Sequence, residues 1–464
     1  MAEVVAESAI LVAVSRKRPR TRVPPQPGRL EDGGEESLAE LAALAATAGA
    51  RIAGSLQQSL TSPDPATLIG AGKLEELRAL ADALRADLVL FDNDLTPTQL
   101  RNLEKRLPAR VVDRTQLILD IFARRARTSE GQLQVELAQL NYLLPRLTGR
   151  GVQMSRLGGG IGTRGPGETQ LESDRRKIAR RIRKIREQLE SVRAARAVQR
   201  RQRQAVPLAT LALVGYTNAG KSTLFNRLTG AGVVADARLF ATLDPTVRQA
   251  QLPSRRRVLL SDTVGFIRNL PHTLVEAFRA TLEEVTESTL LLHVVDVSSP
   301  RAAEQTANVL QMLAEIGVGG RTQLLVLNQI DRLGEPRPNT ELLARRILAA
   351  NSEDSPAAVA VSARTGEGLD RLLEAIDGLL PLDPVAAVRF RFPLSEGAKT
   401  HLLHQFGRVL NEHYLEDSCL VEAEVPESLR KRLRSYEVRE RSNRSLRSRL
   451  GSEPQRTPKP SRDR

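Results

Sequence analysis

The stretch VGYTNAGKSTLFNRLTG, residues 214–230, decides the fold of the central part of this chain. It matches the spacing Gly-x-x-x-x-Gly-Lys-Ser through Gly215, Gly220, Lys221 and Ser222. Glycines let backbone N–H groups close around phosphate oxygens, and the helix that follows offers its positive N-terminus. We expect Lys221 to reach the β- and γ-phosphates of a nucleotide and the Ser222 hydroxyl to bind Mg²⁺.

The sequence around this loop alternates short buried-strand patterns with helices from residue 207 to residue 381. The strand patterns are LATLALVG, RRVLLSD, LLLHVVDV, QLLVLNQ and AAVAVSA. This rhythm is typical of a doubly wound α/β domain with a mostly parallel sheet, which binds ligands at the carboxyl ends of its strands. We therefore predict a P-loop domain over residues 207–381.

Two further motifs predict a latch that responds to the terminal phosphate. Asp262-Thr263-Val264-Gly265 follows the strand RRVLLSD, where Asp262 can hold Mg²⁺ through water and the Gly265 N–H can meet the γ-phosphate. Thr242 lies in FATLD, residues 240–244, between this motif and the phosphate loop. We expect Thr242 to complete the Mg²⁺ shell only while the γ-phosphate is present, which makes a two-state latch.

Base choice is predicted by Asn328-Gln329-Ile330-Asp331 and Ser362-Ala363-Arg364, each of which follows a strand pattern. The Asp331 carboxylate can accept hydrogen bonds from the N1–H and the exocyclic amine of guanine. Adenine has no N1 proton and would leave that carboxylate unpaired. A backbone N–H near Ala363 could contact the guanine O6. The five elements in this order favour GTP over ATP.

The predicted nucleotide site collects residues from all of these motifs. Catalytic roles are assigned to Lys221, Thr242 and Gly265, and Mg²⁺ binding to Ser222, Thr242 and, through water, Asp262. The residues expected to contact GTP are Gly215, Tyr216, Thr217, Asn218, Ala219, Gly220, Lys221, Ser222, Phe240, Ala241, Thr242, Leu243, Asp244, Asp262, Thr263, Val264, Gly265, Asn328, Gln329, Ile330, Asp331, Ser362, Ala363 and Arg364.

Residues 126–206 predict a basic antiparallel helical hairpin. Leucines from Leu133 to Leu147 and apolar residues from Ile178 to Val192 each repeat at spacings of 4, 3, 4 and 3, which makes one apolar seam on each helix. A glycine-rich tip separates the two arms. The second arm also carries a run of basic residues. A charge run of this kind is more often a solvated helix face, but the irregular glycine-rich tip favours contact with RNA phosphates. The RNA contact candidates are Arg150, Arg156, Gly158, Gly159, Gly160, Arg164, Arg175, Arg176 and Lys177.

The flanking regions complete the predicted organisation. Residues 1–36 indicate a flexible N-terminal extension, and residues 37–125 a small α/β domain. Residues 382–429 predict a small C-terminal α+β unit, with a helix over residues 396–411 between two strand patterns, VRFRF and SCLVEAEVP. The Arg- and Ser-rich residues 430–464 indicate a basic disordered tail.

Composition limits the function classes. The 464 residues include 69 Lys and Arg against 55 Asp and Glu, a net charge of +14, which favours a nucleic acid or an acidic membrane as partner. The single cysteine suits a reducing cytosol. No apolar run approaches the roughly 20 residues that cross a bilayer. We therefore expect a cytoplasmic protein.

Several segments together resemble the HflX-type GTPases, within the translation-factor-related P-loop class. They include FDNDLTPTQLRNLEKRL, EGQLQVELAQLNYLLPRL, GGGIGTRGPGETQLESDRRKI, FATLDPT and DTVGFIRNLPHTLVEAFRATLEE, and the match covers about residues 87–380. The resemblance implies a cytoplasmic GTPase, with Mg²⁺ as cofactor, that binds the large ribosomal subunit and acts in ribosome dissociation, rescue or subunit maturation. A monomer is expected.

Two positions depart from the usual pattern of related G proteins. Gln329 stands where a lysine usually packs on the base, and Phe266 stands where Ras-like proteins carry a glutamine that orients the attacking water. An apolar side chain cannot polarise water, so we predict slow intrinsic hydrolysis that a partner accelerates.

Three other functions remain open on the sequence. The chain could be a GTPase switch that recruits a protein effector without RNA, or an ATP- or GTP-driven RNA remodeller. It could also be a GTPase on an acidic membrane, although the apolar seam of the basic helix is needed within the hairpin. Salt dependence separates the first from an RNA-bound form, because phosphate contacts weaken steeply as salt rises.

Overall fold

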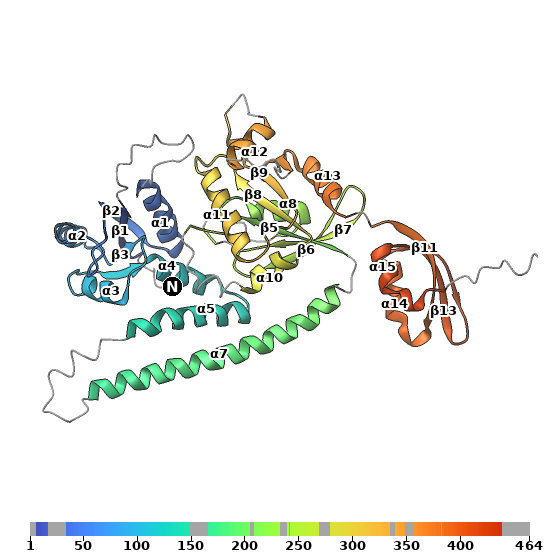
Figure 1. Ribbon diagram of the computed structural model, residues 1–464, viewed down its shortest axis with the longest axis horizontal. Coiled ribbons are helices and arrows are strands. Elements are labelled where there is room, and N and C mark those ends of the chain that lie inside the picture. The colour runs from blue at the N-terminus through green and yellow to red at the C-terminus, as the bar shows by residue number, and fades with distance from the viewer. Residues whose placement is uncertain are drawn as a thin grey trace, which may run out of the picture. The chain divides into compact units, whose positions relative to one another are not determined.

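The computed structural model describes residues 6–16, 34–147, 166–204, 208–232, 239–240, 242–268, 279–334, 339–348, 357–381 and 383–438 (Figure 1). The chain divides into two compact units. The first comprises Met1–Arg200 and Leu208–Leu380, and the second comprises Arg201–Pro207 and Pro381–Arg464.

The N-terminal domain of the first unit is built on a four-stranded parallel sheet with strand order β2-β1-β3-β4. Alternate residues of the strands face opposite sides of the sheet and enter two separate apolar clusters. One cluster takes in α1 and α4, and the other takes in α2 and α3. The elements are β1 (Ser8–Arg16), α1 (Gly34–Ala48), β2 (Arg51–Leu60), α2 (Ala71–Leu84), β3 (Leu88–Phe91), α3 (Pro97–Glu104), β4 (Arg110–Asp113) and α4 (Arg114–Arg125).

Strand β1 corrects the prediction of a flexible extension over residues 1–36. Residues Ser8–Arg16 pair in parallel with both β2 and β3, and Ala9, Ile10 and Val12 are fully buried. A parallel strand that is covered on both faces shows no alternation of polar and apolar residues. The sequence of residues 8–16 therefore indicated only a short apolar run, although these residues form an inner strand of the sheet. Residues 1–5 and 17–33 lie outside the described residues.

Two helices follow this domain. Helix α5 (Ser129–Leu143) continues into a short 3-10 turn (Leu144–Leu147), and α7 spans Pro166–Gln204. The apolar seam predicted on α7 is buried at Ile182, Ile185 and Leu189. On α5 the buried face instead carries Val135, Ala138 and Tyr142 among others, and the leucines of its predicted seam are half-buried.

The two helices are in contact through a side-chain pair. Arg181 of α7 donates to both carboxylate oxygens of Glu136 on α5, over 2.6 and 2.7 Å. The predicted tip of the hairpin, residues 148–165, lies outside the described residues.

The P-loop domain contains a six-stranded sheet with strand order β10-β9-β8-β5-β7-β6. Five strands are parallel, and β6 runs antiparallel to β7 at one edge. The predicted α/β fold with a mostly parallel sheet is confirmed. Its strands are β5 (Ala209–Gly215), β6 (Thr246–Gln251), β7 (Arg257–Asp262), β8 (Leu290–Asp296), β9 (Gln323–Asn328) and β10 (Ala358–Ala360). Its helices are α8 (Lys221–Thr229), α10 (Arg279–Glu287), α11 (Ala302–Glu315), α12 (Thr340–Leu348) and α13 (Leu369–Leu379).

The second unit is an α+β module with an antiparallel sheet of strand order β11-β13-β12. Its core includes Phe390, Phe392, Val421 and Leu403, all fully buried. The elements are β11 (Val385–Pro393), α14 (Gly397–Phe406), β12 (Arg408–Tyr414), β13 (Ser418–Pro426) and α15 (Glu427–Arg432).

Two boundaries of this unit differ from the sequence prediction. The helix predicted over residues 396–411 ends at Phe406, and Arg408–Tyr414 forms β12. Gly407 separates the two because its backbone lies so close to Glu424 that an added Cβ would meet the carbonyl oxygen at 2.9 Å. The predicted tail also begins too early, since Leu433 is buried and the Tyr436 ring lies 5.3 Å from that of Phe392.

Candidate nucleotide-binding site

The phosphate loop joins the end of β5 to the start of α8, and its two glycines occupy positions that a side chain could not. Gly220 adopts φ +92° at the N-cap of α8. A Cβ on Gly215 would lie 2.2 Å from the carbonyl oxygen of Val294 on β8, and Gly215 adopts φ +150°. The loop therefore needs glycine at both places for backbone reasons that are independent of any ligand.

Lys221 folds back over this loop. Its Nζ donates to the carbonyl oxygens of Gly215 (3.0 Å) and Tyr216 (2.8 Å), and the side chain is buried. Burial lowers the pKa of Lys221 to about 8, and nearby Asp262 acts in the opposite direction. The lysine is thus held inside the loop as a cation that is poorly compensated, and a phosphate would provide the missing negative charge.

The structure brings together the three residues predicted to bind Mg²⁺. The hydroxyls of Ser222 and Thr242 both donate to Asp262 Oδ2 at 2.7 Å and lie 2.9 Å from each other. Asp262 is fully buried, and burial raises the pKa of its carboxyl while the two hydroxyls lower it. Its second oxygen, Oδ1, is buried without a hydrogen-bond partner.

This cluster fits a hard cation. One carboxylate and two hydroxyl oxygens are the ligand types that Mg²⁺ takes from proteins when it is also bound by phosphates. Over the described part of the chain, no group of three or more His, Cys, Asp or Glu side chains is placed to hold a metal. A cation here would therefore need phosphate oxygens and water to complete its shell.

The segment around Gly265, residues 262–268, is tied to the phosphate loop by backbone pairing. Thr217 N donates to Phe266 O at 2.7 Å, and Phe266 N donates to Gly215 O at 3.1 Å. A Cβ on Gly265 would lie 3.0 Å from Lys221 Nζ and 2.8 Å from Thr217 Cα. Only glycine allows this approach, so the backbone of Gly265 sits beside the lysine that was predicted to reach the γ-phosphate.

The predicted base-recognition residues also converge on the phosphate loop. Asn328 Nδ2 donates to Ala219 O at 2.8 Å, and Ala363 N donates to Asn328 Oδ1 at 3.0 Å. Ser362 Oγ donates to Asp331 Oδ1 at 2.8 Å, which orients that carboxylate. The three motifs are therefore held as one cluster.

Gln329 reproduces part of what a lysine would do at its position. Its backbone is left-handed, with φ +67°, and its Nε2 donates to Asn218 O in the phosphate loop at 3.1 Å. The amide oxygen Oε1 is buried without a hydrogen-bond partner. The side chain therefore supports the loop through a neutral amide and offers one unused acceptor.

The N-terminal domain contacts the same loop, which sequence reasoning missed. Tyr216 hydroxyl donates to Glu40 Oε1 at 3.1 Å and accepts from Arg268 N at 2.9 Å. Arg114, fully buried, donates to Glu40 (2.6 Å), to Asp92 (2.5 Å) and to Arg268 O (3.1 Å). The only sequence signal was a lone arginine in the apolar context VVDRTQLILD.

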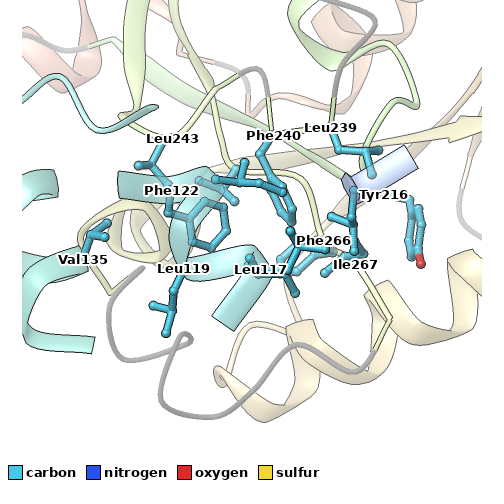
Figure 2. Packing of buried hydrophobic residues seen from close by; sticks show 14 of the residues in the cluster. Leu117, Leu119, Phe122, Val135, Tyr216, Leu239, Phe240, Leu243, Phe266 and Ile267 are labelled. Carbon is cyan, nitrogen blue, oxygen red and sulfur yellow. The ribbon is translucent and has the colours of Figure 1, made fainter. Parts of the chain in front are cut away.

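The segment around Thr242 also packs against the N-terminal domain (Figure 2). The Phe240 ring meets the Phe122 ring of α4 edge to face, with centroids 4.6 Å apart, and Leu243 is buried in the same cluster. Phe266 belongs to this cluster too, so its side chain offers no polar group to a nucleotide. Asp244, predicted among the GTP contacts, places its carboxylate against the start of α5. Ala241 lies outside the described residues.

The RNA contact candidates are only partly described. Arg175, Arg176 and Lys177 are exposed on α7, where Arg176 pairs with Glu172 and Lys177 with Asp174. The remaining candidates, Arg150, Arg156, Gly158, Gly159, Gly160 and Arg164, lie outside the described residues. No helix within the described ranges is both long and apolar enough to span a bilayer.

The phosphate loop, the Asp262 cluster and the parallel sheet together define the chain as a P-loop GTPase of the α/β class. Family models describe three successive parts as "GTP-binding GTPase N-terminal" (residues 35–123), "GTP-binding GTPase Middle Region" (125–203) and "50S ribosome-binding GTPase" (210–329). The chain belongs to the HflX family of GTPases, which confirms the resemblance found in its sequence and makes it an enzyme that hydrolyses GTP.

Individual relatives agree with this assignment along most of the chain. GTPase HflX of Caldanaerobacter subterraneus subsp. tengcongensis is 49% identical over 402 residues, covering 87% of this chain and 90% of the relative. GTPase HflX of Escherichia coli is 44% identical over 390 residues, covering 84% and 89% respectively. The similarity therefore includes the N-terminal domain and the two helices α5 and α7 as well as the P-loop domain.

Proposed function

We propose that this chain is a Mg²⁺-dependent GTP switch that binds the large ribosomal subunit and acts in ribosome dissociation, rescue or subunit biogenesis. The observation that carries the proposal is the meeting of Thr242 and Ser222 on one carboxylate oxygen of Asp262. Thr242 belongs to a segment that also contacts the N-terminal domain, so the metal site and the rest of the first unit are mechanically connected.

In this proposal Ser222, Thr242 and, through water, Asp262 hold Mg²⁺, which would neutralise charge on the β- and γ-phosphates. Lys221 shifts its two hydrogen bonds from loop carbonyls to phosphate oxygens, and the Gly265 N–H meets the γ-phosphate beside it. Thr242 would join the cation shell only while GTP is bound, because the γ-phosphate would help to complete that shell. Thr242→Ala should raise the Mg²⁺ concentration needed to bind a GTP analogue more than that needed for GDP.

Guanine recognition is assigned to Asp331, with Asn328 and the Ala363 N–H as supporting groups. The bond from Ser362 to Asp331 Oδ1 leaves Oδ2 for the base, and the Arg364 guanidinium lies 4.0 Å from Oδ2. An acceptor-only carboxylate selects the N1–H of guanine, because adenine would leave it unpaired. The protein should therefore prefer GTP to ATP.

Hydrolysis by the free protein should be slow. Phe266 is packed into the apolar cluster and cannot orient a water molecule, and no other polar group is assigned to that task. We propose that the ribosome supplies or orders the missing group. The description of the family model over residues 210–329 as a 50S ribosome-binding GTPase supports this choice of partner.

Contact with ribosomal RNA is assigned to the exposed basic face of α7, in keeping with the net charge of +14. Each Lys or Arg that neutralises a phosphate adds roughly 0.7–0.9 to the slope of log affinity against log salt. Replacing Arg175, Arg176 and Lys177 together by Ala should therefore lower that slope by about two, with little change in GTP binding. Replacing Arg345 and Arg346 on α12, which are also exposed, is the matched control and should leave the slope unchanged.

The decisive experiment combines sedimentation with hydrolysis. Purified ribosomal subunits are mixed with the protein and either a non-hydrolysable GTP analogue or GDP, and GTP hydrolysis is measured with and without ribosomes. We expect the protein to co-sediment with the large subunit when the GTP analogue is present and not when GDP is present. GTP hydrolysis should be faster with ribosomes than without them. Equal turnover in both conditions and no analogue-dependent binding would refute the proposal, and equal use of ATP would favour an RNA remodeller instead.

A further inference from the structure

The carboxylate of Asp244 sits at the N-terminus of α5. Its Oδ2 accepts from the backbone N–H groups of Arg127 and Thr128 at 3.0 Å each, and its Oδ1 accepts from Thr128 Oγ1 at 2.5 Å. The first N–H groups of a helix have no partner within it, and its positive end favours an anion. Thr128 is the N-cap residue of α5, and Asp244 therefore holds this cap from a position 116 residues further along the chain.

Gly131 makes room for this carboxylate. A Cβ on Gly131 would lie 2.6 Å from Asp244 Oδ1, closer than a real contact permits. Gly131 is buried in the first turn of α5, and its N–H donates to Thr128 Oγ1 at 3.0 Å. Glycine is a poorer helix former than alanine, so its use here matches the close approach of Asp244.

The contact lies next to the metal site along the backbone. Asp244 is two residues from Thr242, and two residues span at most about 7 Å when extended. On the other side of Thr242, Phe240 is anchored against Phe122. Thr242 thus reaches Asp262 from a short segment that is attached to the N-terminal domain and α5 at both ends.

We propose that Asp244 is a positioning residue that couples the placement of Thr242 at the metal site to the start of α5. Whatever draws Thr242 to Asp262 also draws Asp244 onto α5, and the coupling free energy is the same in both directions. Residues 148–165, the predicted basic tip, follow α5 and its 3-10 turn in the chain. The contact would therefore pass the nucleotide state towards the residues proposed to face the ribosome. The role of Thr242 at a metal site and this last step both rest on the proposed function.

A helix cap with no coupling role makes a different prediction. A plain cap would stabilise α5 equally with GDP and with GTP, so its loss would lower stability and leave nucleotide preference alone. A coupling residue changes the ratio between the dissociation constants of GDP and of a GTP analogue. The ratio is therefore the quantity to measure.

The test uses the full chain with Asp244→Asn, Gly131→Ala and the double variant. Asparagine keeps the size of the side chain but turns an N–H₂ group towards backbone donors, and a Cβ on Gly131 pushes the carboxylate away. Fluorescent analogues of GTP and GDP are titrated in Mg²⁺ without ribosomes. We expect each single variant to weaken the GTP analogue at least fivefold and GDP much less, and the double variant to be no worse than the stronger single one.

Two matched controls are Gly232→Ala and Asp370→Asn. Nothing lies within 4 Å of a Cβ on Gly232, and Asp370 is exposed on α13. Both should leave the ratio unchanged, and circular dichroism verifies that every variant is folded. A ratio that stays at the wild-type value in both single variants, or effects that simply add in the double variant, would overturn the coupling. Since no ribosome is present, failure of the proposed ribosomal function would leave this result standing.

Discussion

The buried arginine of the N-terminal domain allows the sharpest test of what stabilises this domain. Arg114 is 1% exposed and bridges Glu40 (15% exposed) and Asp92 (6% exposed). Arg114→Met removes the charge at similar length and leaves two carboxylates without their main partner. Breaking a buried ion pair by removing one member costs about 3–5 kcal/mol.

The structure favours the lower end of that range. Arg268 lies 3.6 Å from Asp92 and would remain as a partial partner for it, although Arg268 is 21% exposed. We therefore expect a loss of about 3 kcal/mol in the free energy of unfolding. The control is Arg110→Met, whose pair with Glu7 spans 3.5 Å between side chains that are 58% and 53% exposed. Exposed pairs contribute about 0–1 kcal/mol, so this variant should stay near wild type.

The assay is urea unfolding followed by far-ultraviolet circular dichroism, supported by hydrogen exchange. A loss of about 3 kcal/mol corresponds to roughly hundredfold faster exchange in strands whose amides open with the domain. Peptides covering β1, β3 and β4 should show this acceleration in Arg114→Met and not in Arg110→Met. If the two variants lie within 1 kcal/mol of each other, the buried cluster does not stabilise this domain as argued.

Four further predictions concern the nucleotide site and strand β8 beside it. Phosphate binding needs Lys221 as a cation, and its pKa of about 8 in the free protein means that affinity for GTP should fall about tenfold per pH unit above pH 8, with proton uptake visible by calorimetry. Because the pKa of Lys221 is lower in the folded state, the unfolded chain binds more protons between pH 8 and 10.5. The free energy of unfolding of the nucleotide-free protein should therefore rise with pH over that window relative to Lys221→Met. A difference between the two proteins that does not change with pH would contradict the assignment. His293 is buried with its pKa lowered to about 4, so stability should be lost as pH falls from 6.5 through 4, and His293→Leu should flatten that acid loss in urea titrations. Asp331→Asn should weaken GTP and improve xanthosine triphosphate, because an amide N–H can donate to the 2-carbonyl of xanthine; competition binding with the two nucleotides checks this.

Much of the site could be predicted because its contacts are built from short motifs at strand ends. Lys221 and Gly215 are six residues apart, and Asn328 and Asp331 lie in one tetrapeptide. In a parallel sheet such motifs meet at one edge, so their order along the chain is enough to predict that they converge. The bonds from Ser222 and Thr242 to Asp262 follow that expectation.

Local patterns misled where burial and long-range pairing decide the structure. Strand β1 carries the apolar run of an inner parallel strand, and its neighbours β2 and β3 were not assignable as partners from the run alone. Strand β12 has an almost wholly exposed pattern, and its first residues, 408–411, lay within the helix predicted over residues 396–411. Pairing with β13 outweighs that local preference.

The amino-acid order alone thus determined the nucleotide loop, the carboxylate proposed to select guanine and the family, because each depends on residues at fixed short spacings. Only the tertiary structure decided that Glu40 contacts Tyr216, that Arg114 contacts Arg268 and that Asp244 contacts Thr128 at the start of α5. These pairs are separated by 176, 154 and 116 residues. Contacts at such separations arise from packing whole domains together, and no spacing within the chain encodes them.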